Sequence, residues 1–394
     1  MPELHSLTSQ VKCSYFSTSS GADEYTFIIE CSGHMDFPEA LREIDGSYTN
    51  ALSELGLSKE TQVFSRLYTS DIENQKEQLA ASPLYRRLQR GAVSVIQQAS
   101  LIGGPIVLFS YHIKNRDGSS FPKKHLKSEN NSWRNGIVLK GHNYAMLWNA
   151  LYAGGGEFDS QLQTDRIFRD LNDSIENHGM TLLGNGIRTW VHVRDIDNHY
   201  SGMVKARRVF FAEKDLTQKS RYLASTGIEG ASIDTHSLVT VDCMSLSNCV
   251  PEQIVRMEAL DHLSPTIDYG VTFERGLRVR FGDRSHLYIS GTASIDNKGT
   301  VLHLSDITQQ TRRTLENMKA LLEPHGATLS DMAYLFVYLR DPHAIDIVRS
   351  IVQRHVPESI PILYTQAAVC RPSWLVEMEG VGIIRDDTPY PVFL

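Results

Sequence analysis

Metal-binding and disulfide patterns are missing from this sequence. Its five cysteines are odd in number and scattered, and no two of them have C-x-x-C spacing, so neither a structural zinc site nor a disulfide framework is expected. No H-E-x-x-H motif or cluster of His and Asp indicates a catalytic metal. We therefore expect free thiols, no metal and no cofactor.

Long apolar runs and a strong excess of one charge are missing too. The N-terminal stretch MPELHSLTSQ has no apolar core of the kind found in signal peptides, and no later run approaches the length of a membrane span. The formal net charge is -7, and basic residues are not clustered as they are in nucleic-acid-binding proteins. This predicts a cytoplasmic protein with a small molecule as its partner, and with neither nucleic acid nor membrane.

The sequence does contain a domain-sized internal repeat. In three segments, apolar residues at helical spacing end at a glycine, and a strand that closes at an aspartate follows. The three glycines are Gly56, Gly179 and Gly326. These positions recur about 125 and then about 145 residues apart, which is too long for a solenoid and right for whole domains.

Each copy continues with a second helix and finishes with a pair of strands. This repeated order of helices and strands predicts an α+β fold of three tandem domains, each a mixed sheet backed by two helices. The polar, turn-rich stretch between the first two copies predicts a linker. The expected division is residues 1–115, a linker at 116–136, and domains at 137–250 and 251–394.

The stretch AAVCRPSWLVEMEG, residues 367–380, reads as a tight β-hairpin that turns at 371–374 and pairs Ala368 with Glu377. Alternation along the strands gives one face a set of mostly polar side chains, Tyr364, Gln366, Ala368, Cys370, Glu377 and Glu379. A partly desolvated carboxyl close to a second one should have a raised pKa. It could then hold a proton near neutral pH and serve as a general acid.

The repeat resembles the Rid superfamily, the reactive intermediate deaminases, which are also labelled L-PSP endoribonucleases or translation initiation inhibitors. The residues that carry the resemblance are Ile289-Ser290-Gly291, the run from Asp306 to Asn317, Val337-x-Leu339-Arg340-Asp341 and Val376-Glu377-Met378-Glu379. Rid proteins form trimers with ligand clefts between adjacent subunits. Three fused copies therefore imply an intramolecular pseudo-trimer, either monomeric or a weak homo-oligomer.

When the copies are overlaid, only the third keeps the acid. Thr240 of the second copy and Leu108 of the first stand at the position of Glu377. Rid deaminases also bind the substrate carboxylate with an arginine on the preceding strand. That position corresponds to Tyr364 in the third copy and lies near Ser225 in the second, and neither is an arginine. The deaminase activity is therefore not carried over.

A narrower resemblance is to the chorismatases, which remove pyruvate from chorismate in a hydrolase or lyase reaction. FERGLRVRF, YISGTASIDNKGTVLHLSDITQQTRRTLENMKALL and VCRPSWLVEMEG carry it in the third copy, and RTWVHVRDI, HYSGMVKARR and YLASTGIEG carry it in the second. The resemblance implies that Glu377 protonates the enolpyruvyl methylene. It also implies that Cys370 marks the branch that makes 3-hydroxybenzoate, and that Arg207 binds a substrate carboxylate.

The residues predicted to form the site are Glu377 and Cys370 as catalytic residues, with Arg207, Arg275, Tyr200, Tyr364 and Glu379 as substrate-binding residues. Four of them have a simpler interpretation: a surface or paired carboxylate for Glu377, a small buried filler for Cys370, surface charge for Arg207 and helix packing for Tyr200. The function expected is removal of pyruvate from chorismate or a related enolpyruvyl or cyclic carboxylate. The alternatives are an imine or enamine deaminase and a non-catalytic small-molecule-binding Rid protein.

Overall fold

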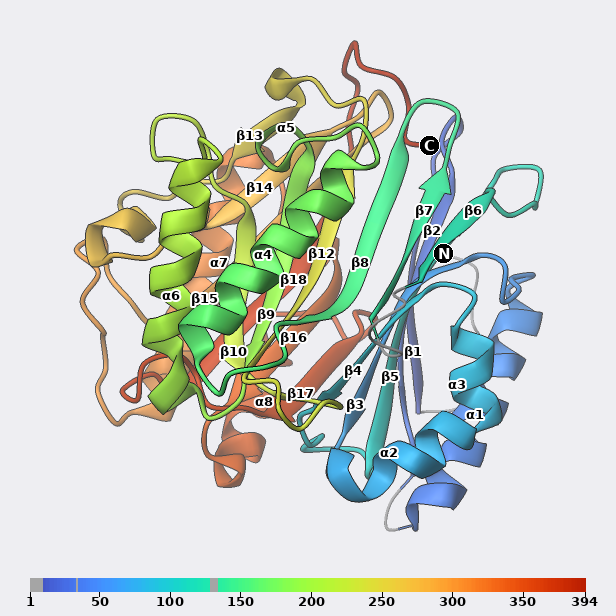
Figure 1. The fold of residues 1–394 in the computed structure, drawn as a ribbon, viewed down its shortest axis with the longest axis horizontal. Helices are drawn as coiled ribbons and strands as arrows, with labels where there is room; N and C mark the ends of the chain where they lie inside the picture. The colour runs from blue at the N-terminus through green and yellow to red at the C-terminus, as the bar shows by residue number, and fades with distance from the viewer. Residues whose placement is uncertain (1–9, 33–34, 128–133) are drawn as a thin grey trace.

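The computed structural model describes residues 10–32, 35–127 and 134–394. Within these ranges the chain forms three six-stranded sheets, with helices on their outer faces (Figure 1). The strand orders are β1-β2-β5-β3-β4-β11, β10-β9-β12-β8-β7-β6 and β13-β14-β15-β18-β16-β17. The predicted α+β fold with three related units is confirmed.

The elements of the three units follow one another along the chain. The first unit holds β1 (Val11–Phe16), β2 (Asp23–Glu30), α1 (Phe37–Glu54), β3 (Gln62–Thr69), α2 (Ile72–Ala81), α3 (Pro83–Leu88), β4 (Ala92–Gln97) and β5 (Ile106–Lys114). The second holds β6 (Lys123–Lys127), β7 (Asn135–Lys140), β8 (Ala145–Ala153), α4 (Ser160–Glu176), α5 (Leu182–Asn185), β9 (Gly186–Val193), α6 (Ile196–Glu213), β10 (Ala224–Glu229), β11 (Ala231–Ser232) and β12 (Val239–Leu246). The third holds β13 (Ile254–Arg256), β14 (Gly276–Arg280), β15 (Arg284–Ala293), α7 (Ile307–Leu322), β16 (Met332–Leu339), α8 (Ile345–Val352), β17 (Ile362–Gln366) and β18 (Val376–Arg385).

The glycines that end the first long helix of each unit show why the repeat could be read from the sequence. Gly56, Gly179 and Gly326 all adopt left-handed backbone, with φ of 60°, 71° and 70°, a conformation that glycine adopts without steric cost. At the opposite ends of these helices, Asp36, Asp159 and Asp306 cap the backbone N–H three residues on. The same start and stop signals therefore produce the same helix in each copy.

The predicted hairpin at 367–380 is wrong in its pairing. β17 runs parallel to β16, and β18 lies antiparallel on the other side of β16, so β17 and β18 are not neighbours. A strand that follows a crossover helix returns parallel to the strand before that helix, and here it takes the sheet edge. The segment 367–375 therefore crosses the end of β16 to reach β18. The predicted turn at 371–374 is nevertheless present, since Trp374 N donates to Arg371 O at 3.0 Å.

The prediction of a linker at 116–136 is wrong for the residues that form β6 and the start of β7. These strands pair with each other and continue the second sheet through β8. The strand was not predicted because the lysine-rich sequence of β6 resembles a linker. Edge strands often carry charged side chains, which prevent pairing with other chains. Residues 128–133 of this stretch, like residues 1–9 of the N-terminal stretch, lie outside the described residues.

The inner sheet faces of the three units share one core, while units 1 and 2 each have a further hydrophobic cluster of their own. Their inner sheet faces meet in aromatic contacts, with Phe64 stacked on Trp148 at 4.5 Å between ring centroids and Phe109 edge-on to Phe336 at 5.1 Å. Neighbouring sheets also touch at their edges, since β11 of the second unit extends the first sheet beside β4. No helix of the described residues is long and apolar enough to cross a membrane.

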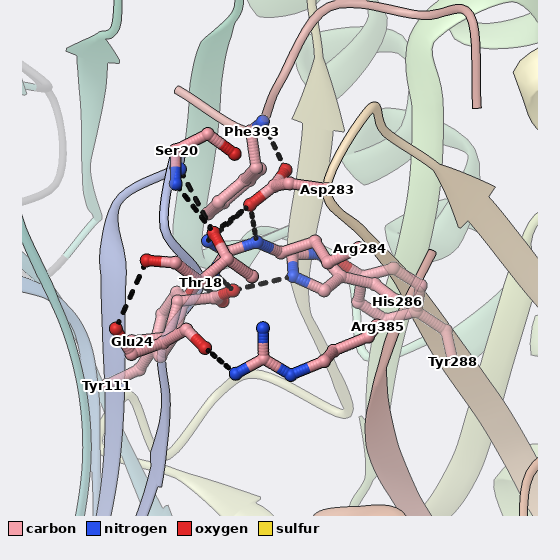
Figure 2. A network of polar contacts seen from close by, with 12 residues as sticks. Thr18, Ser20, Glu24, Tyr111, Asp283, Arg284, His286, Tyr288, Arg385 and Phe393 are labelled. Atoms are coloured by element: carbon pink, nitrogen blue, oxygen red, sulfur yellow. Dashed lines mark hydrogen bonds and ion pairs between the residues drawn. The ribbon is translucent and has the colours of Figure 1, made fainter. Parts of the chain in front are cut away.

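A buried ion pair crosses each of the three seams between units. The pairs are Arg66 with Asp242 between units 1 and 2, Arg188 with Glu379 between units 2 and 3, and Arg284 with Glu24 between units 3 and 1. Figure 2 shows the last of these, which also involves Asp283, Thr18 and Phe393, near the C-terminus. Because each pair is buried, loss of one partner leaves an uncompensated charge in the core.

Candidate active site

Glu377 lies near the start of β18, one of the two central strands of the third sheet. In the two ladders it stands opposite Tyr338 of β16 and Ala293 of β15. The alternation of the strand puts Val376 and Met378 on the opposite face, as predicted from the sequence. Only 4% of Glu377 is exposed, and no described residue donates a hydrogen bond to its carboxyl group.

A cavity of about 360 Å³ opens beside this carboxyl group. Its walls come from both sides of the seam between units 2 and 3: α6 and β10 of the second unit, and β15, the segment before β14 and the segment before β18 of the third. Five of the seven predicted site residues line it, namely Glu377, Cys370, Arg207, Arg275 and Tyr200. The expected cleft between adjacent units is therefore present at this seam.

Gly291 makes the room that Glu377 occupies. The β15–β18 pairing shifts register between Ile289 and Thr292, and at this irregularity a Cβ on Gly291 would overlap Glu377 Oε1. The backbone N–H of Gly291 donates to Thr226 Oγ1 of the second unit at 2.9 Å. The Ile289-Ser290-Gly291 motif thus seats the acid and joins the two units.

The cavity is rich in positive charge. Arg207 of α6 is 98% buried and donates to Ser225 Oγ at 3.2 Å, and its Nε has no partner in the described structure. Arg275 donates twice to Ser264 O, at 3.0 and 2.9 Å. Lys205, Arg208 and Arg371 complete the cationic lining. Five cations around one carboxyl group favour an anionic ligand with more than one charge.

The protonation states of the site follow from its burial. Burial, reinforced by the Glu379 carboxylate, raises the pKa of Glu377 to about 8, against the opposing charges of Arg188 and Arg275. Burial also raises the pKa of the Cys370 thiol to about 12, with the charge of Glu377 as the next cause. At neutral pH the site therefore holds a protonated carboxylic acid and a neutral thiol. This suits proton donation and not thiolate attack.

One wall of the cavity was not predicted. The ring of Tyr269 contacts two guanidinium groups, with Arg371 at 4.7 Å and Arg275 at 5.3 Å from the ring centroid. Arg371 also lies over Trp374, at 4.8 Å. Arg371 and Trp374 sit inside a stretch that was already of interest, so their place could have been inferred. Tyr269 lies in a loop whose sequence carries no motif.

Tyr364 does not reach the cavity. It is buried where the third unit meets the first, and its backbone O accepts from Leu101 N at 2.9 Å. The prediction placed it beside Glu377 because it assumed the hairpin, but β16 separates the two strands. Tyr364 therefore does not belong to the site, which corrects its predicted role as a substrate-binding residue.

Glu379 shares the face of Glu377 but does not line the cavity either. It is fully buried, paired with Arg188 and hydrogen-bonded by Thr226 and by Tyr338. A carboxylate whose oxygens are occupied in this way is not available to a ligand. Glu379 therefore lies behind Glu377 and not in the cavity, which corrects its predicted contact with substrate.

The other two units carry no counterpart of the acid. By the strand ladders, Thr240 faces His192 as Glu377 faces Tyr338, which agrees with the sequence overlay. In the first unit the equivalent residue is Val107, opposite Tyr68, one position from the predicted Leu108. Among the described residues, no group of three or more His, Cys, Asp or Glu side chains could hold a metal ion.

Known proteins similar to this chain support the family. The family model described as Endoribonuclease L-PSP matches residues 279–384. The 3-aminoacrylate deaminase RutC of Acinetobacter baylyi is 30% identical over 97 residues, which cover 24% of this chain and 77% of that protein. The chain belongs to the Rid superfamily. The matched segment of this Rid protein contains β15, α7, β16 and β18, and so includes Gly291 and Glu377.

Two solved structures extend the comparison. A chorismatase crystal structure aligns with 93% of this chain and 100% of its own, with a TM-score of 0.63 and 16% identity. RidA from the Antarctic bacterium Psychrobacter aligns with 33% of this chain and 99% of its own, with a TM-score of 0.28 and 20% identity. The chorismatase likeness covers all three units, so the Rid protein has a chorismatase-type fold.

Proposed function

We propose that this Rid protein removes pyruvate from chorismate or a closely related cyclic enolpyruvyl carboxylate. The observation that carries the proposal is a buried Glu377, its pKa raised to about 8 by burial and Glu379, at the wall of a cavity lined by five cations. Chorismate carries two carboxylates and one enolpyruvyl ether, so its charges match the lining and its ether needs an acid. The chorismatase-type fold supports the same choice.

In the proposed reaction Glu377 gives its proton to the methylene carbon of the enolpyruvyl ether. The π electrons of the C=C bond form the new C–H bond, and an oxocarbenium ion forms at the ether carbon. The Glu377 carboxylate that remains lies next to this cation and stabilises it. Water adds to that carbon and returns a proton to Glu377. Collapse of the hemiketal breaks the bond between this carbon and the ether oxygen, and the hemiketal O–H proton passes to that oxygen, so that pyruvate and the ring alcohol leave.

Cys370 is assigned to the product outcome. Hydrolysis gives a dihydrodiol and consumes one water, whereas 3-hydroxybenzoate and pyruvate together contain the same atoms as chorismate. A neutral thiol in the cavity wall, facing Tyr200 and Arg207, can act on the ring and decide between these outcomes. Incubation with chorismate, followed by assays for pyruvate and for hydroxybenzoates, tests both assignments. No pyruvate at high enzyme concentration rejects the function.

Arg207 should bind a substrate carboxylate, because its guanidinium is buried with Nε unpaired. We expect Arg207→Gln to lower kcat/KM by roughly 10- to 150-fold, from a lost charged hydrogen bond of about 1.5–3 kcal/mol, and mainly through KM. Steady-state kinetics with chorismate measure this. Arg169→Gln on the exposed face of α4 is the matched control, and equal effects of the two variants would contradict the assignment.

Gly291→Ala should displace the Glu377 carboxyl group while leaving the residue itself unchanged. The new methyl group would overlap the Glu377 carboxyl group, so we expect a loss of stability of about 1–3 kcal/mol from overpacking. A carboxyl group moved by about 1 Å should also cost roughly 100-fold in kcat. Thermal unfolding and pyruvate release measure the two effects. Gly46→Ala in α1, where a Cβ meets nothing within 4 Å, should change neither adversely.

A second candidate function is deamination of an imine or enamine carboxylate. The identity to RutC favours it, and so does Arg207, because its side chain reaches Ser225, near the position of the carboxylate-binding arginine of Rid deaminases. Ammonia release from a short-lived iminoacid would identify this activity. Tight carboxylate binding without turnover by the wild type, unchanged in Glu377→Gln, would indicate a binding protein.

A further inference from the structure

Glu379 is surrounded by hydrogen-bond donors. Arg188 and the Thr226 hydroxyl from the second unit contact its Oε2, and the Tyr338 hydroxyl donates to its Oε1 at 2.6 Å. Arg188 can only donate, and the Thr226 hydroxyl oxygen already accepts from Gly291 N and from Arg188 Nη2. These contacts with a guanidinium group and two hydroxyl groups are those of a charge-paired carboxylate.

A continuous set of contacts connects this carboxylate to the acid. Thr226 Oγ1, which donates to Glu379, also accepts the N–H of Gly291 at 2.9 Å and a hydrogen bond from Arg188 Nη2 at 2.6 Å. Gly291 in turn lies against Glu377 Oε1. The second unit thus supplies both the cation and the hydroxyl group that hold Glu379 behind Glu377.

The charged and titratable groups around Glu377 come from every surrounding element. The charged ones are Glu379 on its own strand, Arg188 on β9, Arg275 before β14, and Lys205, Arg207, Arg208 and Arg371 along the cavity. The neutral ones are Cys370 before β18, Tyr200 and Tyr269 in the cavity wall, and Tyr338 opposite Glu377 on β16. Glu379 is the single anion of this set. Without it, the buried Arg188 and the cationic cavity would all favour the ionised form of Glu377.

Building on the function proposed above, we propose that Glu379 is a positioning residue whose fixed negative charge, held by Arg188 across the seam, keeps Glu377 protonated as the general acid. Of the two charges, Glu379 has the larger effect on the pKa of Glu377, which it raises, and Arg188 has the smaller effect, which lowers it. The acid is thus complete only when units 2 and 3 are docked. This explains why the site lies at a seam.

An infrared titration of the protonated carboxyl band tests the proposal without any substrate. The band of Glu377 is assigned by its loss in Glu377→Gln, and the wild-type midpoint is expected near pH 8. In Glu379→Gln the midpoint should fall by about one pH unit or more, a tenfold fall in the protonated to ionised ratio at a given pH. An unchanged midpoint overturns the proposal.

Two further variants keep the test decisive if Glu379→Gln folds poorly. Arg188→Gln combined with Glu379→Gln removes both buried charges, which proteins often tolerate better than one, and its midpoint should lie between those of Glu379→Gln and the wild type. A midpoint at or above the wild-type value overturns the proposal. Asp242→Asn breaks the equivalent buried pair between units 1 and 2 and should leave the Glu377 midpoint unchanged.

Kinetics separate this role from a purely structural one. If the wild type releases pyruvate from chorismate, the alkaline limb of its pH profile should move down with the infrared midpoint in Glu379→Gln, while the rate at pH 6 stays within about threefold. An equal loss at all pH values would indicate a structural role and reject the proposal. If the wild type releases no pyruvate, the proposed function fails, and the infrared midpoint still decides the role of Glu379.

Discussion

Glu377→Gln is expected to lower the rate of pyruvate release from chorismate by roughly 10²- to 10⁴-fold, the usual contribution of a positioned general acid. The amide has nearly the same shape as the protonated carboxyl group but has no proton that it can transfer to carbon. Substrate binding should change little, because the cations of the cavity remain in place. The measurement is kcat and KM with chorismate at pH 7.

The pH dependence of the wild type provides the second half of this prediction. Because the acid is active in its protonated form, activity should be full below about pH 7 and should fall as the pH rises through about 8. Thr240→Val is the matched control, since Thr240 occupies the same ladder position in the second unit. The assignment is wrong if Glu377→Gln keeps more than about a tenth of the wild-type rate, or if the control loses as much.

Arg284→Met should produce the largest loss of stability. Arg284 is fully buried and donates to Glu24 at 2.6 Å and twice to Asp283, at 2.9 and 2.7 Å (Figure 2). Its guanidinium also lies 5.1 Å from the ring centroid of Phe393, near the C-terminus. Removing it takes the guanidinium group from two buried carboxylates, so that Glu24 keeps His286 and Tyr111 and Asp283 keeps only uncharged donors, which costs about 3–5 kcal/mol. Chemical denaturation monitored by fluorescence measures the loss.

The pH dependence of stability follows from the same network. Burial alone would raise the pKa of Glu24, but the charges of His286 and Arg284 outweigh it and lower the pKa to about 2. A carboxyl group with a depressed pKa contributes stability above its unfolded pKa and loses it as the pH falls toward about 2. Arg284→Met should therefore narrow the gap in stability between pH 6 and pH 3.

Arg385→Met is the matched control for this network. Arg385 reaches the same seam, where it donates to Ser17 O at 2.9 Å, but its side chain is exposed. Its loss should cost less than about 1 kcal/mol. If Arg284→Met were no more destabilising than Arg385→Met, the buried pair would not hold units 3 and 1 together in the way inferred.

The sequence was most informative where local rules determine structure. The glycines that end the repeated helices, and the alternation that puts Glu377 and Val376 on opposite faces, are set by residues close together in the chain. They were predicted, and the positions in the structure agree. Arg207 and Glu377 lie in different units, and the resemblance of both stretches to one family brought them together.

What the sequence could not provide depends on pairing between distant strands. The 367–375 segment has the composition of a hairpin turn, but its partner strands are separated by β16, which only the sheet order reveals. This error put Tyr364 in the site. The role of Glu379 was missed because its partner Arg188 is far away in sequence and belongs to another unit.

A crystal structure with an unreactive chorismate analogue, in which a lactyl ether replaces the enolpyruvyl ether, is the most direct test of the central claim. We predict that the analogue occupies the cavity between units 2 and 3. A Glu377 carboxyl oxygen should lie about 3–3.5 Å from the carbon that replaces the methylene group, with the two ligand carboxylates on Arg207 and Arg275. An analogue bound at another seam, or one that leaves Glu377 out of reach of that carbon, would contradict the account.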